Sequence, residues 1–466
     1  MHSSKEGLGM GNILKIEAHG VIDRYSYIIN FSDIQDNLKA LYAENGHGKT
    51  NLLKAIRYMS IADVESIGRL LMTPVQSIEI ESKMGIVKYI REDLYNAVFE
   101  ILNNAESKSY EFKVSVSDIR TVLGEDSEFI IIDDDIKNRY MELKEIVNYI
   151  IGNIELLGTD RLYLSEGEHQ SRRFYRYKMA RQRQNSIYNQ ISMKDSGFNS
   201  GITVETSLDS LGELYERDIR NKSIFSRGDR GVYANFTRNI LHKASSSNSR
   251  SLIFKSAGNA RKAIDKYINK IDGNDELIRK YNLIDFKEYD SVRQLISSAS
   301  PVNKSEFKYV APFLLPYLQS LSERMLEILA TAEKINIFVE AINTLLGDIR
   351  ISYSLNTGFK LHKLKSSDPE ELGSEIDPEL LSSGEKHIIL LLANVALASS
   401  QNSMMLMIDE PEISLGIQWQ KVLVKYIRDL TRESDFQVIL ATHSPIILEN
   451  YMDEDIIVSH ESEELV

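Results

Sequence analysis

The spacing of hydrophobic residues changes once near the start of the chain. Three short runs rich in β-branched and aromatic residues predict strands, at 13–16, 25–31 and 38–42. Beyond Gly48 the apolar residues recur at the spacing of a single helix face, at Leu52, Leu53, Ile56 and Met59. The pattern therefore predicts a strand, a glycine-rich turn and a helix, in that order.

Farther along, strand and helix patterns alternate. They predict a hairpin at 77–81 and 86–90, a strand at 110–116, a helix at 138–151 and a buried strand within 154–164. Residues 166–345 are mostly polar, and only 315–346 carries a long helical pattern there. A second hairpin at 351–355 and 359–364 leads into alternating helices and strands from Leu381 onward. We therefore expect an α/β protein with a mostly helical insertion.

Composition narrows the classes of protein that the chain can belong to. Its 466 residues suit two or three domains, and its net charge of −13 argues against general binding of polyanions. The chain has no cysteine, which excludes disulfides, a thiolate nucleophile and Cys-based zinc sites. The longest apolar run, 388–398, is too short to span a bilayer, and the N-terminus does not resemble a secretory signal. We expect a cytoplasmic protein.

Residues 43–50 follow the phosphate-loop pattern G-x-x-x-x-G-K-[ST], with Ala43 in the first glycine position. Gly46 and Gly48 let the backbone N–H groups at the helix start approach phosphates closely. We expect Lys49 to bind the β- and γ-phosphates and Thr50 to give its hydroxyl to Mg²⁺. The alternative is a chance glycine-rich turn, and Ala43 leaves the rate of any hydrolysis open.

Two apolar runs near the C-terminus end in residues with catalytic chemistry. Residues 404–408 lead into Asp409 and Glu410, as expected of a buried strand that delivers carboxylates to a phosphate site. Asp409 would hold Mg²⁺ through water, and Glu410 would polarise the attacking water. Residues 437–441 lead into His443, which could reach the γ-phosphate. The alternatives are solvated acids on a capped core strand and a structural histidine.

Residues 381–386, Leu-Ser-Ser-Gly-Glu-Lys, precede an apolar helix predicted at 387–398. A serine N-cap followed by Glu385 in the first turn is a good capping arrangement. The functional alternative is a helix N-terminus that faces the γ-phosphate bound to a partner subunit.

These motifs together resemble those of the ABC/SMC-type ATPases. The segments 45–53, 381–386, 409–415 and 442–444 resemble their phosphate loop (Walker A), signature, Walker B with D-loop, and switch histidine. The resemblance implies a nucleotide site formed by Asn45, Gly46, His47, Gly48, Lys49, Thr50, Asn51, Ser382, Ser383, Gly384, Glu385 and Ser414. It implies metal binding by Thr50 and Asp409, and catalysis by Glu410 and His443.

The resemblance also implies a fold and an assembly. We expect an ATPase head, a mixed β lobe packed on a RecA-like parallel sheet, from residues 1–165 and 346–466, with 166–345 as the insertion. A head-to-tail homodimer or higher oligomer would place Ser382–Glu385 of one subunit over the ATP of the other. Gln76 is one candidate for the family's Q-loop glutamine.

The insertion is too short for SMC arms, and more than 330 residues separate the phosphate loop from the signature, unlike in ABC transporters. The chain therefore resembles the RecF-like and OLD-like stand-alone ATPases. We expect it to carry no TOPRIM nuclease domain of the kind that OLD proteins have, and it then resembles the ATPase subunits of the anti-phage systems PARIS (AriA-like) and Septu (PtuA-like). In such systems a separate effector, often a nuclease, docks on the ATPase. Residues 157–161 weakly resemble a Thr-x-Arg element of these proteins, and a polar turn is the alternative.

A basic segment within the insertion is a candidate for contacts with DNA or a phage component. Its cations alternate with aromatic residues, and they are Arg172, Arg173, Arg176, Lys178, Arg181 and Arg183. A solvated helix face or a subunit contact is the alternative.

Three functions remain open from the sequence. The first is the ATPase sensor and scaffold of an anti-phage complex that controls a separate effector. The second is a RecF-like DNA repair ATPase. The third is an interaction scaffold that does not hydrolyse ATP.

Overall fold

The computed structural model describes most of the chain and divides it into two compact units. The described residues are 12–31, 37–116, 120–121, 129–130, 134–158, 203–225, 256–298, 307–365, 368–400, 403–432, 436–449, 451, 456–458 and 460–461. Unit 1 comprises Met1–Thr203 and Ser382–Val466, and unit 2 comprises Val204–Leu381. The segment 346–381, which the sequence analysis assigned to the head, falls in unit 2.

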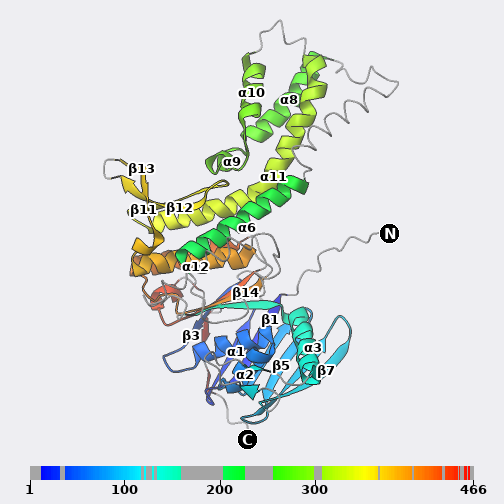
Figure 1. The fold of residues 1–466 in the computed structure, drawn as a ribbon, viewed down its shortest axis with the longest axis vertical. Helices are drawn as coiled ribbons and strands as arrows, with labels where there is room; N and C mark the ends of the chain where they lie inside the picture. The colour runs from blue at the N-terminus through cyan, green and yellow to red at the C-terminus, as the bar shows by residue number, and fades with distance from the viewer. Residues whose placement is uncertain are drawn as a thin grey trace. The chain divides into compact units, whose positions relative to one another are not determined.

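Unit 1 contains a seven-stranded antiparallel sheet, drawn mostly in blue and cyan in Figure 1. Its order is β17 (His460–Glu461), β2 (Tyr25–Asn30), β1 (Ile13–Val21), β4 (Ser77–Ser82), β5 (Gly85–Arg91), β6 (Asn96–Asn103) and β7 (Lys108–Ser115). Alternating buried and half-buried positions along β4 and β5 show that one face of the hairpin is in the core. The hairpin predicted at 77–90 and the strand predicted at 110–116 are confirmed.

The second sheet of unit 1 is parallel and mostly apolar. Its order is β10 (Asn153–Leu157), β14 (Ser403–Asp409), β15 (Gln437–Thr442), β3 (Leu38–Tyr42) and β16 (Ile456–Val458). Every residue of β15 is buried, as expected for a strand covered on both faces. The strands predicted at 38–42, 404–408 and 437–441 are therefore confirmed, and the strand expected within 154–164 ends at Leu157.

Helices cover both sheets of unit 1. They are α1 (Lys49–Ile61), α2 (Val64–Met72), α3 (Asp134–Ile151), α12 (Ser383–Ser400), α13 (Ile417–Thr431) and the single turn α14 (Pro445–Leu448). Helix α1 packs on β10 and β14, α3 packs on β4 and β5, and α12 packs on β14. Residues of both sheets and of α1, α2 and α3 share one hydrophobic core. Unit 1 also has a short pair, β8 (Arg120–Thr121) and β9 (Phe129–Ile130). The mixed α/β fold predicted from the sequence is present.

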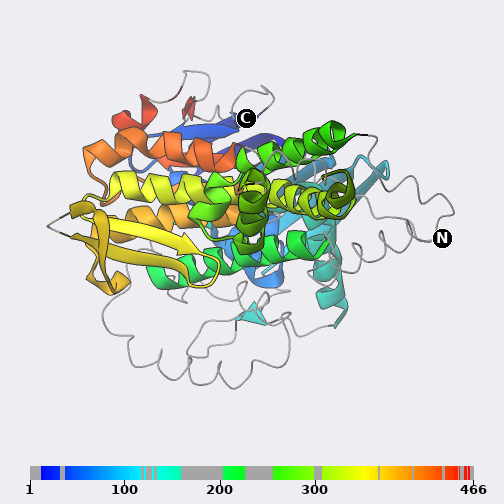
Figure 2. The same cartoon turned by 90° about the horizontal axis from the view of Figure 1, so that it is seen from above.

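Unit 2 is mostly helical. It consists of α6 (Val204–Phe225), α8 (Ala257–Asp272), α9 (Glu276–Lys280), α10 (Lys287–Ser298), α11 (Phe307–Leu345), the sheet β11 (Ile349–Ser354), β12 (Gly358–Lys365) and β13 (Asp368–Glu375), and a 3-10 turn at Pro378–Leu380. Helix α6 runs beside α11 in both views (Figure 1 and Figure 2), and α8 also packs on α11. Buried Ile335 and Phe338 give α11 its apolar face. The sequence predicted a long helix from 315. Helix α11 begins eight residues earlier, at Phe307.

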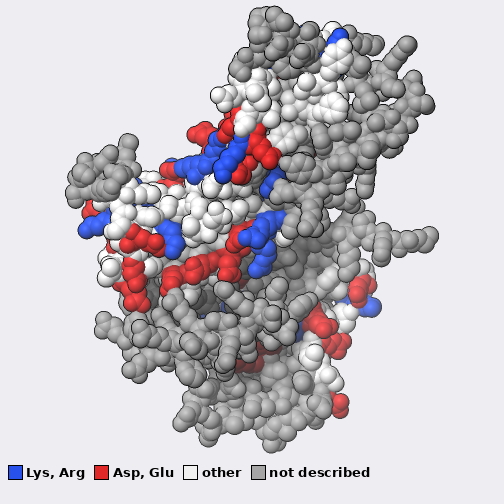
Figure 3. Space-filling view, turned by 45° about the horizontal axis from the view of Figure 1, so that its top comes forward, with Lys and Arg blue, Asp and Glu red and all other residues white. Residues whose placement is uncertain are grey.

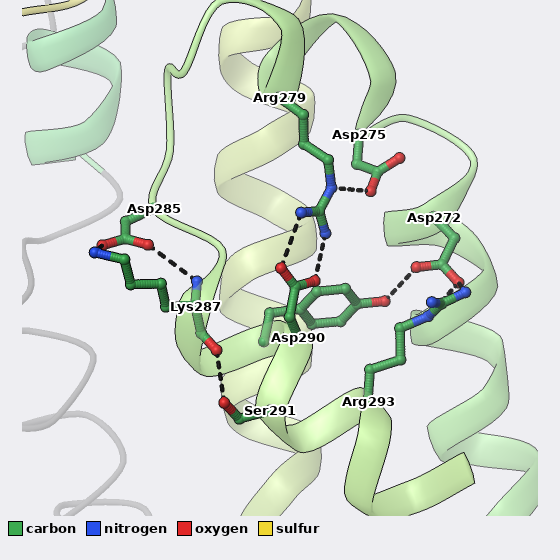
Figure 4. Close-up of polar contacts among 9 residues, drawn as sticks. Asp272, Asp275, Arg279, Asp285, Lys287, Asp290, Ser291 and Arg293 are labelled. Carbon is green, nitrogen blue, oxygen red and sulfur yellow. Dashed lines mark hydrogen bonds and ion pairs between the residues drawn. The ribbon is translucent and has the colours of Figure 1, made fainter.

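Ion pairs link α9 to α10 in unit 2 (Figure 4). Arg279 donates two hydrogen bonds to the carboxylate of Asp290, at 2.6 and 3.0 Å, and a third to Asp275 at 2.5 Å. Its guanidinium also lies 4.1 Å from the ring centre of Phe286. The hydrogen bonds to Asp290 are the main reason that the pKa of Arg279 is raised, against the opposing effect of burial. Arg279 therefore orients α10 on α9.

Replacing Arg279 with Ala is expected to loosen this corner without unfolding unit 2. The Arg279 side chain is 35% exposed, so solvent screening limits the stabilisation. We expect a loss of about 1 kcal/mol. Hydrogen exchange should become faster across 276–298 and stay unchanged in unit 1. Lys287→Ala is the matched control, because the Lys287 and Asp285 side chains are 89% and 69% exposed. Equal exchange in both variants would show that the Arg279 pairs do not hold the corner.

None of the helices described in the structure is long and apolar enough to cross a membrane.

Candidate functional site

The candidate site lies at one edge of the parallel sheet of unit 1. Strands β14, β15 and β3 are neighbours and run in the same direction, so their carboxyl ends meet at this edge. Asp409 pairs with Ala441, and Thr442 pairs with Tyr42. The segments that follow the three strands are therefore brought together, as the sequence analysis required.

The phosphate loop leads from β3 into α1 with two glycines in the left-handed region. Gly46 has φ +89° and Gly48, the N-cap of α1, has φ +81°. A Cβ at Gly48 would also lie 2.7 Å from the Val21 side chain, so glycine is required there twice over. No side chain caps α1. A helix N-terminus of this kind leaves its first backbone N–H groups available to an anion.

Ala43 fits the first position of the loop without strain. It is buried and does not have a positive φ, so the backbone there does not need glycine. The ammonium of Lys49, which is also buried, donates a hydrogen bond to the carbonyl oxygen of Ala43. The loop therefore keeps its lysine inside the turn despite the departure from the usual pattern.

Thr50 and Asp409 meet although 359 positions separate them in the chain. The hydroxyl of Thr50 donates to Asp409 Oδ2 at 2.6 Å. Asp409 Oδ1 is buried and has no hydrogen-bond partner among the described residues. Burial raises the pKa of Asp409, the bond from Thr50 opposes that rise, and the nearby Glu410 carboxylate adds to it. A cation at this point would offset the cost of burying the charge.

Glu410 has a strained backbone directly after β14. Its φ is +50°, which is unusual for a residue with a side chain, and its N–H donates to Ala441 O at 2.8 Å. Strain of this kind persists where the surrounding structure holds it, and it gathers at functional sites. The turn carries the half-buried Glu410 side chain past the end of the strand that delivers Asp409.

His443 follows β15 and contacts a residue that the sequence analysis did not single out. Its backbone N–H donates to Glu412 Oε1 at 2.8 Å, and its Nδ1 lies 3.1 Å from the same oxygen. Thr442 is fully buried, whereas the imidazole is exposed. The backbone of His443 is therefore held at the end of β15, while its imidazole ring is open to solvent.

The signature segment forms the capping arrangement expected from its sequence. The backbone N–H and hydroxyl of Ser382 each donate to Glu385 Oε2 at 2.7 Å. A Cβ on Gly384 would lie 2.8 Å from Ser414 O, so glycine allows α12 to approach the D-loop closely. Ser382 and Ser383 are exposed at the helix start. Capping therefore leaves this helix end accessible.

Most of the chain matches a known protein family. The model of the family described as "AAA ATPase domain" matches residues 26–448, which is most of the chain. The chain belongs to the AAA ATPase domain family. Membership of this family shows that the protein is an ATP-hydrolysing enzyme. No protein of curated function matches it.

The ATPase is also similar to solved SMC head structures. The Smc head domain from Pyrococcus furiosus bound to the C-terminal domain of ScpA is 13% identical, with a TM-score of 0.36 over 97% of this chain and 96% of that one. The Smc head with coiled coil and joint from Pyrococcus yayanosii is 12% identical, with a TM-score of 0.35 over 97% and 98%. The SMC head from Thermotoga maritima is 11% identical, with a TM-score of 0.33 over 97% and 99%.

Two aromatic residues of this ATPase lie against the phosphate loop, and motif reasoning missed them. Tyr25 stacks on His47 with ring centres 4.1 Å apart, and the hydroxyl of Tyr27 donates to His47 O at 2.6 Å. Their signal was present, since two tyrosines at alternate positions of a predicted strand share one face. Only the topology, however, shows that β2 runs beside the loop.

Some predicted residues of the ATPase are not brought to the site or lie outside the described residues. Gln76, the Q-loop candidate, packs its side chain against Gly20, where a Cβ would lie 2.3 Å from Gln76 Cγ. The basic segment 171–183 and residues 159–161 lie outside the described residues. Within the described part, no group of three or more His, Asp or Glu residues is placed to hold a metal ion.

Proposed function

We propose that this enzyme binds ATP with Mg²⁺ at the phosphate loop and hydrolyses it between two subunits. The observation that supports this most directly is the meeting of Thr50 and Asp409 beside the N-terminus of α1. A P-loop threonine and a carboxylate at the end of another strand of the same sheet are the protein ligands of Mg²⁺ in P-loop ATPases. Lys49 and the first N–H groups of α1 would hold the phosphates.

The donor set at this point fits Mg²⁺. Asp409 Oδ1 is a buried oxygen that lacks a partner among the described residues, and the Thr50 hydroxyl lies beside the other oxygen. Mg²⁺ prefers one or two protein oxygens together with water and substrate phosphates. Bound there, the ion would neutralise charge that develops on the β- and γ-phosphates. Asp409 and Thr50 would hold it without a larger cluster of acids.

The reaction then needs a base and a group that senses the γ-phosphate. Glu410 would accept a proton from the attacking water, because its turn lies directly after Asp409. His443, at the end of the neighbouring strand, would contact the γ-phosphate. Asn45, Gly46, His47, Gly48 and Asn51 would surround the phosphates through the loop and the first turn of α1.

A second subunit would complete the site. Ser382, Ser383 and Gly384 start α12, and Glu385 holds that start through the capping bonds. The helix end would face the γ-phosphate of the partner subunit's ATP, and Ser414 would contact it from the D-loop.

We propose that in the cell this ATPase is the sensor and scaffold subunit of an anti-phage complex, and that it controls a separate effector, such as a nuclease. The support is the resemblance of its motifs to OLD-like stand-alone ATPases of defence systems. The alternative is a RecF-like repair ATPase that binds DNA. On the face drawn in Figure 3, the charged side chains of the described residues are of both signs.

Co-purification tests this role. The chain is expressed with its neighbouring genes, purified with ATP and Mg²⁺, and weighed by native mass spectrometry. We expect an oligomer that carries a second polypeptide. Protection against phage should then require both the gene for this ATPase and the gene for that polypeptide. An ATPase that carries no second polypeptide but binds DNA junctions tightly would support the repair role instead.

A further inference from the structure

Glu412 is a buried acid that no step proposed so far uses. It lies in the D-loop, two residues after Glu410, and its side chain is only 7% exposed. Its Oε1 accepts the backbone N–H of His443 at 2.8 Å and lies 3.1 Å from His443 Nδ1. One carboxylate oxygen therefore contacts both the backbone and the ring of the histidine.

This contact determines which ring nitrogen of His443 is available. An ionised carboxylate only accepts hydrogen bonds, so its closeness favours the form of His443 in which Nδ1 carries a proton. Nε2 is then the nitrogen left for another group. A carboxylate that fixes the tautomer and orientation of a histidine in this way is a common device in catalytic and metal sites.

The loops that carry Glu412 and His443 are tied to each other at a second point. Gln420, in the first turns of α13, donates to Leu415 O in the D-loop at 2.8 Å and accepts from the Ser444 hydroxyl at 2.7 Å. The D-loop also closes on itself, since Leu415 N donates to Glu412 O at 3.0 Å. Glu412 is thus held in place from its own loop while it holds His443.

A purely structural role does not explain the acid well. Glu412 Oε2 is buried and has no hydrogen-bond partner among the described residues. A buried polar atom without a partner destabilises the folded state. Groups that persist despite such a cost are often the ones that function requires.

We propose that Glu412 is a positioning residue for ATP hydrolysis, which keeps the Nδ1–H form of His443 and presents Nε2 to the γ-phosphate. The proposal rests on the role proposed for His443. It also links the D-loop, which would face the partner subunit, to the histidine that contacts the nucleotide of its own subunit. A shift of the D-loop would thereby reach His443 through one carboxylate.

Steady-state kinetics of four proteins test the proposal: the parent, Glu412→Gln, His443→Ala and the double variant. The amide of Glu412→Gln keeps the shape and can still accept hydrogen bonds, but it lacks the charge that strengthens the bond to Nδ1. We expect kcat to fall about tenfold and KM for ATP to stay within about twofold, because the phosphate loop is untouched. In the His443→Ala background, the same change should leave kcat unaltered.

A spectroscopic measurement separates positioning from general loosening. With ¹⁵N-histidine labelling, the signal lost in His443→Ala identifies His443, and its nitrogen shifts should report the Nδ1–H form in the parent and a mixture in Glu412→Gln. Exposed Glu449, on the same segment as His443, provides the control Glu449→Gln, which should match the parent.

The outcomes separate the two proposals. If His443→Ala hydrolyses ATP as the parent does, the role of His443 itself is wrong. If His443→Ala is slow while Glu412→Gln is normal, or if the two losses multiply in the double variant, Glu412 does not act through His443.

Discussion

Glu410→Gln is expected to bind ATP and fail to hydrolyse it. The amide cannot accept a proton from the attacking water, and general-base catalysis contributes about 10²- to 10⁴-fold to rates. We therefore expect kcat to fall by at least about 100-fold, with ATP affinity close to that of the parent. Since ATP would then persist between two subunits, the variant should form stable dimers or higher oligomers. Turnover is measured by phosphate release, and assembly by light scattering with and without ATP.

The strained turn at Glu410 makes a folding control necessary. The positive φ belongs to the backbone, so Gln and Glu should be accommodated equally, and the melting temperature should not change. Glu449→Gln is the matched control, since it removes the same charge from an exposed position. Normal turnover in Glu410→Gln would remove Glu410 from the mechanism, while slow turnover without ATP-dependent assembly would count against the shared site.

The core of the site could be predicted because its chemistry depends on short local patterns. A glycine-rich turn between a strand and a helix is visible in residues 38–61, and the apolar run before Asp409 is visible as a buried strand. Parallel strands end at a common edge, so local elements in the right order imply a meeting of distant residues. The bond between Thr50 and Asp409 is the outcome of that rule.

Contacts between side chains of different loops could not be predicted in the same way. Glu412 stood inside a quoted motif, but only the register of β14 and β15 brings it to His443. Tyr25 likewise comes beside His47 because β2 passes the phosphate loop, which no spacing along the chain reveals. The sequence placed Gly384 at a helix start without showing why glycine is needed there. In the structure, the backbone of Ser414 lies too close to leave room for a Cβ.

The middle of the chain was harder to predict for a different reason. The two prolines of α11, Pro312 and Pro316, lie near its start, where Pro312 precedes the predicted helix and Pro316 is its second residue. Proline disfavours a helix interior, and the apolar pattern predicted a helix only from 315 onward. Packing of α11 along α6 and α8 outweighs that local preference. The same long-range packing places the hairpin of β11 and β12 in unit 2 rather than with the head.

Lys49→Ala is expected to impair function by weakening ATP binding. Hydrogen bonds between a charged group and its partner contribute about 1.5–3 kcal/mol each, which corresponds to about 10- to 100-fold in affinity. The loss should appear in the dissociation constant of ATP, measured by calorimetry, whereas Glu410→Gln should change only turnover. ATP-dependent oligomers should also be absent in Lys49→Ala.

Because Lys49 is buried and donates to Ala43 O, an alanine there could act through the loop instead of through the charge. Lys49→Met separates the two effects, since methionine fills a similar volume without the ammonium. Lys113→Ala, at an exposed position of β7, is the control for loss of a surface cation. Weak binding in both Lys49 variants, with melting temperatures near that of the parent, is the expected result. Tight ATP binding by Lys49→Met would show that the charge is not needed, and the phosphate site proposed at α1 would then be wrong.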